Sequence, residues 1–232
     1  EKLGIYVLNS INPFRLEGQK SIMIEAIQQL GWQVPDWIVC PGGNLGNSSA
    51  FGKALKEMYD LGLIDRLPRL AIIQTEGASP LYQAFTKEFD DFEPMKAETI
   101  ATAIKIGNPV NYKKAVRSIQ WTNGWVEFVT DQEVMDAKAL IDSAGIGCEP
   151  ASACSLAGTK KLVDKGVIKA GESVVGVLTG HLLKDPDATI GYHSNSLDNI
   201  TPRYPNQFLD AGDDIEEIIG LLSQRDPDKV TV

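Results

Sequence analysis

The sequence predicts an α/β fold, an open and mostly parallel β-sheet with helices on both faces. Short apolar runs alternate along the chain with segments whose apolar residues recur at helical spacing, and this alternation is typical of parallel sheets. The composition is that of an ordinary globular domain, with 43% hydrophobic and 23% charged residues. The length of 232 residues suits one large domain, or one and a half, with a substantial core.

The first half of the chain is expected to contain three strands and two helices. Apolar runs predict the strands, at residues 5–8, 37–40 and 70–74. Apolar residues at helical spacing predict the helices, near residues 17–30 and from about 48 to 61. Gly62 is a plausible helix end, and residues 9–13 are expected to form a loop.

The second half repeats the alternation. Helices are predicted at residues 112–119, 131–144 and 150–163, with a short amphipathic helix at 214–223. Strands are predicted at 125–129 and at 173–178, where the run looks buried, and residues 185–205 look like a loop. Thr130 and Glu133 fit a capping box at the start of one helix. The helix at 150–163 is rich in small residues, so another element is expected to pack close to it.

The charge and hydropathy patterns exclude two classes of partner. The 22 lysines and arginines are scattered, which argues against a nucleic-acid-binding stripe. No apolar run approaches the ~20 residues that a membrane-spanning helix needs. With a net charge of −9, the protein as a whole repels anions, so any anion that it binds must be held by local geometry.

The cysteine and histidine content gives no sign of disulfides or of zinc. The three cysteines, Cys40, Cys148 and Cys154, are few and odd in number, which favours a reducing compartment such as the cytoplasm. Cys148 and Cys154 are expected to be buried as small apolar residues. The two histidines, His181 and His193, do not stand at metal-ligand spacing from them, so no metal site is expected.

The most informative segment is the glycine-rich turn at residues 41–47, between a predicted strand and a predicted helix. Glycines let a backbone turn tightly and approach a ligand, and the amides at a helix start favour an anion such as phosphate. The turn could also be a connection that binds nothing. It could belong to a dinucleotide-binding fold, with Glu76 as the ribose-binding acid, although the glycines run G-G-x-x-G and not G-x-G-x-x-G. It lacks the Gly-Lys-Ser/Thr ending of a P-loop.

Four segments are informative when they are taken together, namely residues 9–20 (Asn-Ser-Ile-Asn-Pro-Phe-Arg-Leu-Glu-Gly-Gln-Lys), 42–47 (Gly-Gly-Asn-Leu-Gly-Asn), 101–109 (Ala-Thr-Ala-Ile-Lys-Ile-Gly-Asn-Pro) and 178–181 (Leu-Thr-Gly-His). Together they resemble segments of the threonine synthases, a family of fold-type II pyridoxal-phosphate enzymes. The resemblance runs from about residue 8 to residue 195, in the family's order and with similar separations. It implies the large domain of that fold.

The resemblance implies which residues bind the cofactor, pyridoxal 5′-phosphate. The turn would hold the cofactor's phosphate through Gly43, Asn44, Leu45, Gly46 and Asn47. Thr179 would hydrogen-bond the pyridine nitrogen, and since a hydroxyl is too weak an acid to protonate a pyridine, the ring would stay neutral. Without the family context, Thr179 reads as a β-branched residue that ends a strand. Residues 101–104 and 149–152 also resemble segments that line the cofactor cleft, and His181 is expected to support the loop after Thr179.

The resemblance also implies the substrate, O-phospho-L-homoserine. Asn9, Ser10 and Arg15 match the family's clasp for the substrate phosphate, to which a guanidinium donates paired charge-assisted hydrogen bonds. Arg15 could instead be solvated, and Asn9 and Ser10 could be turn formers. The reaction would convert O-phospho-L-homoserine and water to L-threonine and phosphate. The alternatives are another fold-type II lyase, such as a threonine dehydratase, and a non-catalytic dinucleotide- or anion-binding module.

The family's Schiff-base lysine, which lies in a Ser-x-Lys-Asp type motif, has no match in this sequence. Lysines 20, 53, 105 and 184 all stand in other contexts. The family carries the motif N-terminal to the matched region, so the chain is expected to be the C-terminal portion of a longer threonine synthase. Residues 1–15 would return from the smaller domain, and residues 16–232 would form the large cofactor-binding domain. The missing N-terminal part would be a partner, a homodimer stays open, and the chain alone is expected to be inactive.

Overall fold

The computed structural model describes residues 4, 6–206 and 209–225. Within these residues, four strands form one sheet in the order β3-β2-β1-β4, and all three neighbouring pairs are parallel. The strands are β1 (Trp37–Pro41), β2 (Arg69–Thr75), β3 (Trp125–Val129) and β4 (Val174–Gly176). The predicted fold class, an open parallel sheet within an α/β domain, is therefore confirmed.

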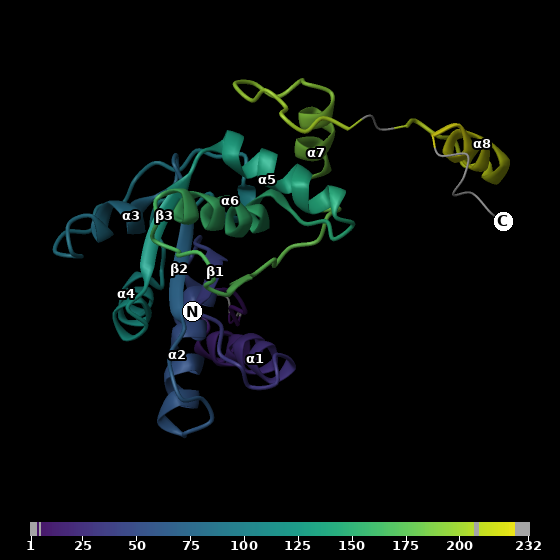
Figure 1. Cartoon of the computed structure of the whole chain (residues 1–232). Coiled ribbons are helices and arrows are strands. Elements are labelled where there is room, and N and C mark those ends of the chain that lie inside the picture. Colours follow the sequence, from purple (N-terminus) through teal and green to yellow (C-terminus); the bar gives the residue numbers. More distant parts are fainter. Residues whose placement is uncertain (1–3, 5, 207–208, 226–232) are drawn as a thin grey trace.

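Helices cover both faces of this sheet, and they connect successive strands (Figure 1). They are α1 (Pro13–Gln29), α2 (Gly46–Asp60), α3 (Pro80–Phe85), η1 (Thr102–Ile104), α4 (Tyr112–Trp121), α5 (Asp131–Ser143), α6 (Pro150–Asp164), α7 (Pro186–His193) and α8 (Ile215–Arg225). Among the residues that the structure describes, no helix is both long enough and apolar enough to cross a membrane.

The two faces of the strands contribute to two different apolar clusters. Ile38, Cys40 and Ile72 pack with buried residues of α1, α2 and α4. Val39 and Ile73, which alternate with them, pack with buried residues of α5 and α6 on the other face. Figure 1 shows α1 and α2 on the opposite side of the strands from α5 and α6. This burial on both faces explains why the strands are continuous apolar runs in the sequence.

Several predicted boundaries agree with the structure. The strand at 125–129 and the helix after it are confirmed, and both capping-box hydrogen bonds between Thr130 and Glu133 are present. The prediction of close packing by the small-residue helix is also confirmed. A Cβ on Gly158 of α6 would lie 2.4 Å from the Cγ1 atom of Ile73 in β2, so the helix rests directly on the sheet.

Four predictions at the element level are wrong. Residues 6–8 are exposed and form no strand, because no described strand lies beside them, while Ile5 lies outside the described residues. β4 is a half-buried edge strand and not a buried one, because β1 is its single neighbour among the described strands. The predicted loop at 185–205 contains α7. The helix predicted to start near residue 17 begins at Pro13, because the Asn12 side chain accepts a hydrogen bond from the Phe14 N–H. The helices α3 and η1 were not predicted.

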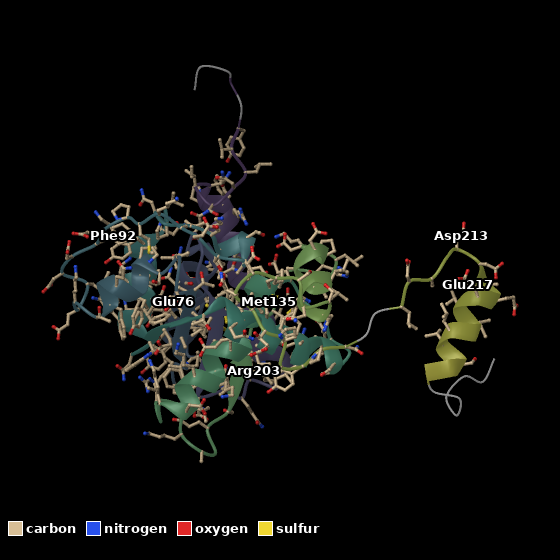
Figure 2. All side chains as sticks on the ribbon, turned by 90° about the horizontal axis from the view of Figure 1, so that it is seen from above. Glu76, Phe92, Met135, Arg203, Asp213 and Glu217 are labelled. Carbon is tan, nitrogen blue, oxygen red and sulfur yellow. The ribbon has the colours of Figure 1, made fainter. Side chains whose placement is uncertain are left out.

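The amphipathic helix predicted near residues 214–223 is present as α8. Figures 1 and 2 show it apart from the sheet and the helices that pack on it, with the labelled Asp213 and Glu217 far from the rest of the described chain. The remaining elements therefore build the candidate site without it.

Candidate functional site

The candidate site is a cavity of about 300 Å³. Its walls come from the turn after β1, from the segment after β4, from α1, from η1 and from the start of α6. Ligands of open α/β sheets bind beyond the carboxyl ends of the strands, and this cavity lies where β1 and β4 end. The lining includes all six residues predicted to bind a cofactor, Gly43, Asn44, Leu45, Gly46, Asn47 and Thr179.

Among the residues that the structure describes, no side chain caps the backbone amides at the start of α2. α2 begins at Gly46, and its N-cap residue Leu45 adopts a left-handed conformation with φ of 62° and makes no capping hydrogen bond through its side chain. The first N–H groups of a helix have no partner within the helix, so they remain available to a ligand. The positive end of the helix dipole adds to the attraction for an anion.

Gly43 is required by the close approach of another segment. A Cβ at this position would lie 3.1 Å from the Cα of Ile104 in η1 and 3.2 Å from the carbonyl oxygen of Ala103. The absence of a side chain thus lets η1 close one wall of the cavity against the turn.

Thr179 is held by the start of α6. The Oγ of Ser152 accepts hydrogen bonds of 2.9 Å from the N–H groups of Thr179 and Gly180, and it lies 3.1 Å from the Thr179 hydroxyl oxygen. Gly180 has no room for a side chain, because a Cβ there would lie 2.0 Å from the carboxyl carbon of Glu149. These contacts fix the backbone that carries the Thr179 hydroxyl. The turn and Thr179 therefore face one cavity.

The structure separates the three residues predicted to clasp a substrate phosphate. Ser10 and Arg15 line the cavity, whereas Asn9 is not among the lining residues. The Asn9 side chain is exposed and accepts a hydrogen bond of 3.1 Å from the Ile11 N–H, which closes a local turn. This contact matches the alternative of a turn former.

The cavity also contains an ion pair that the sequence did not reveal. The Nζ of Lys184 lies 2.9 Å from Oε2 of Glu149, whose side chain is 4% exposed. The hydrogen bond with Glu149 raises the pKa of Lys184, so this lysine is held in its charged form. Sequence reasoning noted both residues but had no means of pairing them.

Gln19 is a further lining residue that the prediction missed. It lies one helical turn after Arg15 on α1, on the same side of that helix. Its Oε1 atom is buried and has no hydrogen-bond partner among the described residues. The i, i+4 spacing from Arg15 was the available signal.

Other candidate residues lie outside the cavity. Glu76 is exposed and absent from the lining, so the described structure gives no support to its reading as a ribose-binding acid. The Nδ1 of His181 accepts a hydrogen bond of 3.1 Å from the Leu183 N–H, a loop contact of the kind expected. Cys40, Cys148 and Cys154 are buried and free, and burial raises the pKa of each thiol. The described residues hold no group of three or more metal-ligating side chains.

Comparisons with known proteins match most of this sequence to one family. The family model "Pyridoxal-phosphate dependent enzyme" matches residues 1–180. The threonine synthase of Methanocaldococcus jannaschii is 55% identical over 192 residues, which cover 82% of this chain and 47% of that protein. "Threonine synthase 2, chloroplastic" of Arabidopsis thaliana is 46% identical over 207 residues, 88% of this chain and 40% of that protein. The chain thus spans about half the length of these relatives.

Solved structures show the same fold. The threonine synthase of Escherichia coli superposes with a TM-score of 0.64 and 19% identity, over 94% of this chain and 50% of that one. The L-serine ammonia-lyase of Rhizomucor miehei superposes with a TM-score of 0.71 and 21% identity, over 85% of this chain and 61% of that one. At such identities the likeness concerns the fold alone.

Proposed function

The chain belongs to the pyridoxal-phosphate dependent enzymes, and from this premise we propose that it is the cofactor-binding part of a threonine synthase. The complete enzyme would convert O-phospho-L-homoserine and water to L-threonine and phosphate. One observation carries the proposal. A single cavity gathers a glycine turn with free helix amides, a hydroxyl at a strand's end, and the guanidinium-bearing residue of the predicted substrate clasp.

The lining residues fit pyridoxal phosphate at both of its ends. The unpartnered amides at the start of α2 suit a phosphate group, and Gly43 leaves its backbone open to one. Thr179 would donate a hydrogen bond to the pyridine nitrogen without protonating it. When bound, the cofactor supplies an electron sink for the substrate's carbanion. Glu149 is already neutralised by Lys184, so it need not repel an incoming phosphate.

The cavity also suits a substrate that carries a second phosphate. Arg15 and Ser10 would bind it through a planar cation and a hydroxyl, and Gln19 stands beside them on α1. These side chains favour a threonine synthase over a threonine dehydratase, whose substrate has no phosphate to clasp. The alternative of a dinucleotide-binding module is weaker, because Glu76 does not line the cavity.

The Schiff-base lysine would come from a part of the protein outside this chain. Lys184 reaches the cavity, but its ammonium group is paired with Glu149. We therefore assign it no covalent role. The free, buried cysteines suit a reducing compartment, so we place the enzyme in the cytoplasm.

The test is a fusion protein. The portion of the Methanocaldococcus jannaschii threonine synthase that this chain does not cover would be joined to it, and the release of threonine and phosphate from O-phospho-L-homoserine measured. We expect turnover by the fusion and none by this chain alone. In the fusion, Arg15→Gln should raise KM for the phosphorylated substrate by about 10-fold or more, since it removes a charge-assisted contact. Deamination of L-threonine that is unaffected by Arg15→Gln would instead identify a dehydratase.

A further inference from the structure

The Asn111 side chain forms its hydrogen bonds outside the helix whose first turn it precedes. It is the N-cap residue of α4, and asparagine is among the best N-cap residues because its side chain can accept a hydrogen bond from the helix. Asn12 does this at the start of α1. The Asn111 side chain makes no such bond to α4, although it is 4% exposed. Its hydrogen bonds go to two other segments.

Both of these segments belong to the candidate site. The Asn111 Nδ2 donates to the carbonyl oxygen of Ser10 at 3.0 Å and to that of Asn44 at 3.2 Å. The Asn111 backbone N–H also donates to Asn44, at 3.3 Å. One buried amide therefore joins the segment of the predicted substrate clasp to the predicted cofactor-phosphate turn.

The bonds to Asn44 also affect the direction of a cavity amide. In a trans peptide the C=O and the following N–H point in opposite directions, because the unit is planar. Fixing the Asn44 carbonyl toward Asn111 thus directs the Leu45 N–H away from Asn111. Leu45 lines the cavity and has a left-handed φ of 62°, which is unfavourable for a residue with a side chain. The hydrogen bonds from Asn111 therefore help to stabilise this peptide in its orientation.

We propose that Asn111 is a positioning residue that locks the two anion-binding segments of the site to each other. The proposal rests on the proposed function for the identity of the two anions, cofactor phosphate and substrate phosphate. Asn111 itself would touch neither. Its role would be to hold Ser10 and the turn at a fixed separation, so that a protein with one phosphate bound is already shaped for the other.

Two variants separate this role from capping α4. Asn111→Asp keeps the shape and is as good an N-cap, but it removes both Nδ2 donors. Asn111→Ser is also a good N-cap, is uncharged, and is too short to reach both carbonyls. The matched control is Asn108→Asp, which adds the same charge at an exposed position of the same loop. Circular dichroism would establish that each variant is folded.

The first readout is amide hydrogen exchange, which needs no ligand. The reporters are the Asn12 N–H, which donates to Asn9, and the Ser49 N–H, which donates to Leu45. Both Asn111 variants should raise the exchange rates of these two amides by about fivefold, which is the change that the loss of a hydrogen bond worth ~1 kcal/mol produces. Exchange within α4 should stay unchanged, and Asn108→Asp should change neither reporter.

The second readout uses the active fusion with saturating pyridoxal 5′-phosphate. Asn111→Ser should raise KM for O-phospho-L-homoserine by about 10-fold and lower kcat by less than about threefold, because it disturbs the binding of the ground state and the transition state alike. A loss of folded enzyme would lower kcat with KM unchanged.

Exchange that increases only within α4, or not at all in either loop, would overturn the proposal and leave Asn111 as a helix cap. Unchanged KM in Asn111→Ser would overturn it as well. Because hydrogen exchange is measured without cofactor or substrate, the locking role can fail while the proposed function stands. Conversely, the exchange result can hold in a fusion that proves to have another substrate.

Discussion

At the scale of single residues, the site depends on glycines that leave room for a neighbouring segment. Gly43 faces η1 and Gly180 faces the buried carboxyl group of Glu149. In both cases the neighbour lies nearer than an ordinary Cβ contact. A methyl group at either position would therefore displace a wall of the cavity and not merely fill a space.

Gly43→Ala is expected to weaken the binding of pyridoxal 5′-phosphate by about 10-fold or more, because the backbone of η1 must move before the turn can close on a phosphate. Equilibrium dialysis of the fusion protein would measure this. The control is Gly18→Ala on α1, where a Cβ meets nothing within 4 Å. Equal affinities in the wild-type and Gly43→Ala proteins would show that the turn does not hold the phosphate.

Sequence reasoning placed some site residues and missed others for a physical reason. The turn was predicted to hold a phosphate because its chemistry is local, a glycine-rich connection between a strand and a helix, whereas Thr179 was predicted only through the resemblance to a family. Asn9, Asn12 and Asn111 have the same side chain, yet one closes a turn, one caps its own helix and one bridges two distant carbonyls. Only the tertiary arrangement distinguishes them.

At the scale of elements, α6 is the helix in closest contact with the sheet. Gly158→Ala is expected to lower the free energy of unfolding by about 1–3 kcal/mol, because the new methyl group would overlap Ile73 of β2. Chemical denaturation would measure the loss. Gly18→Ala should instead be neutral or stabilising by up to ~1 kcal/mol, since its site is open and alanine favours helix. A similar effect of both substitutions would contradict the packing of α6 on β2.

The end of α7 should respond to pH through His193. Burial lowers the pKa of His193, an effect that Asp142 opposes and Lys138 reinforces. Its Nδ1 accepts a hydrogen bond from the Asn206 N–H at 3.0 Å, which a protonated Nδ1 cannot do. Because the folded pKa is the lower one, the stabilisation is complete above the unfolded value of about 6.5 and is lost as the pH falls through the folded pKa.

The matching experiment compares thermal unfolding of the wild-type chain and of His193→Gln, whose side chain does not titrate. Between about pH 7 and about pH 5, the melting temperature of the wild-type chain should fall further than that of the variant. Parallel losses in both proteins would mean that other groups account for the pH response.

The misplaced elements have separate causes, tertiary for α7 and β4 and local for α1. The sequence pattern predicts a loop where α7 lies, because the stability of this helix comes from a distant contact. The buried Tyr192 donates a hydrogen bond of 2.6 Å to Asp136 of α5. β4 was read as buried because its valines suit a central strand, and its place at the sheet's edge depends on strand order. The helix α1 begins earlier than predicted because Asn12 and Pro13, which were expected to lie in a loop, form its N-terminal cap.

At the scale of the whole molecule, the alternation of strand and helix patterns was enough to predict a sheet whose strands are parallel. Buried parallel strands are apolar on both faces, so each one stands out locally. The pattern carries no information on which surfaces remain uncovered. That property is visible only in the assembled structure.

One such surface is an apolar groove of about 340 Å³ beside β4. Leu140 and Ile146 line it and are 40% and 67% exposed, and the edge of β4 lies next to them. Apolar patches and open strand edges promote association. We expect the isolated chain to self-associate in sedimentation velocity experiments, and the double variant Leu140→Glu/Ile146→Glu to shift it toward monomer by charge repulsion. Leu61→Glu, at a residue that is 74% exposed after α2, should leave the association unchanged. If both variants dissociate the chain equally, general charge and not this groove controls its association.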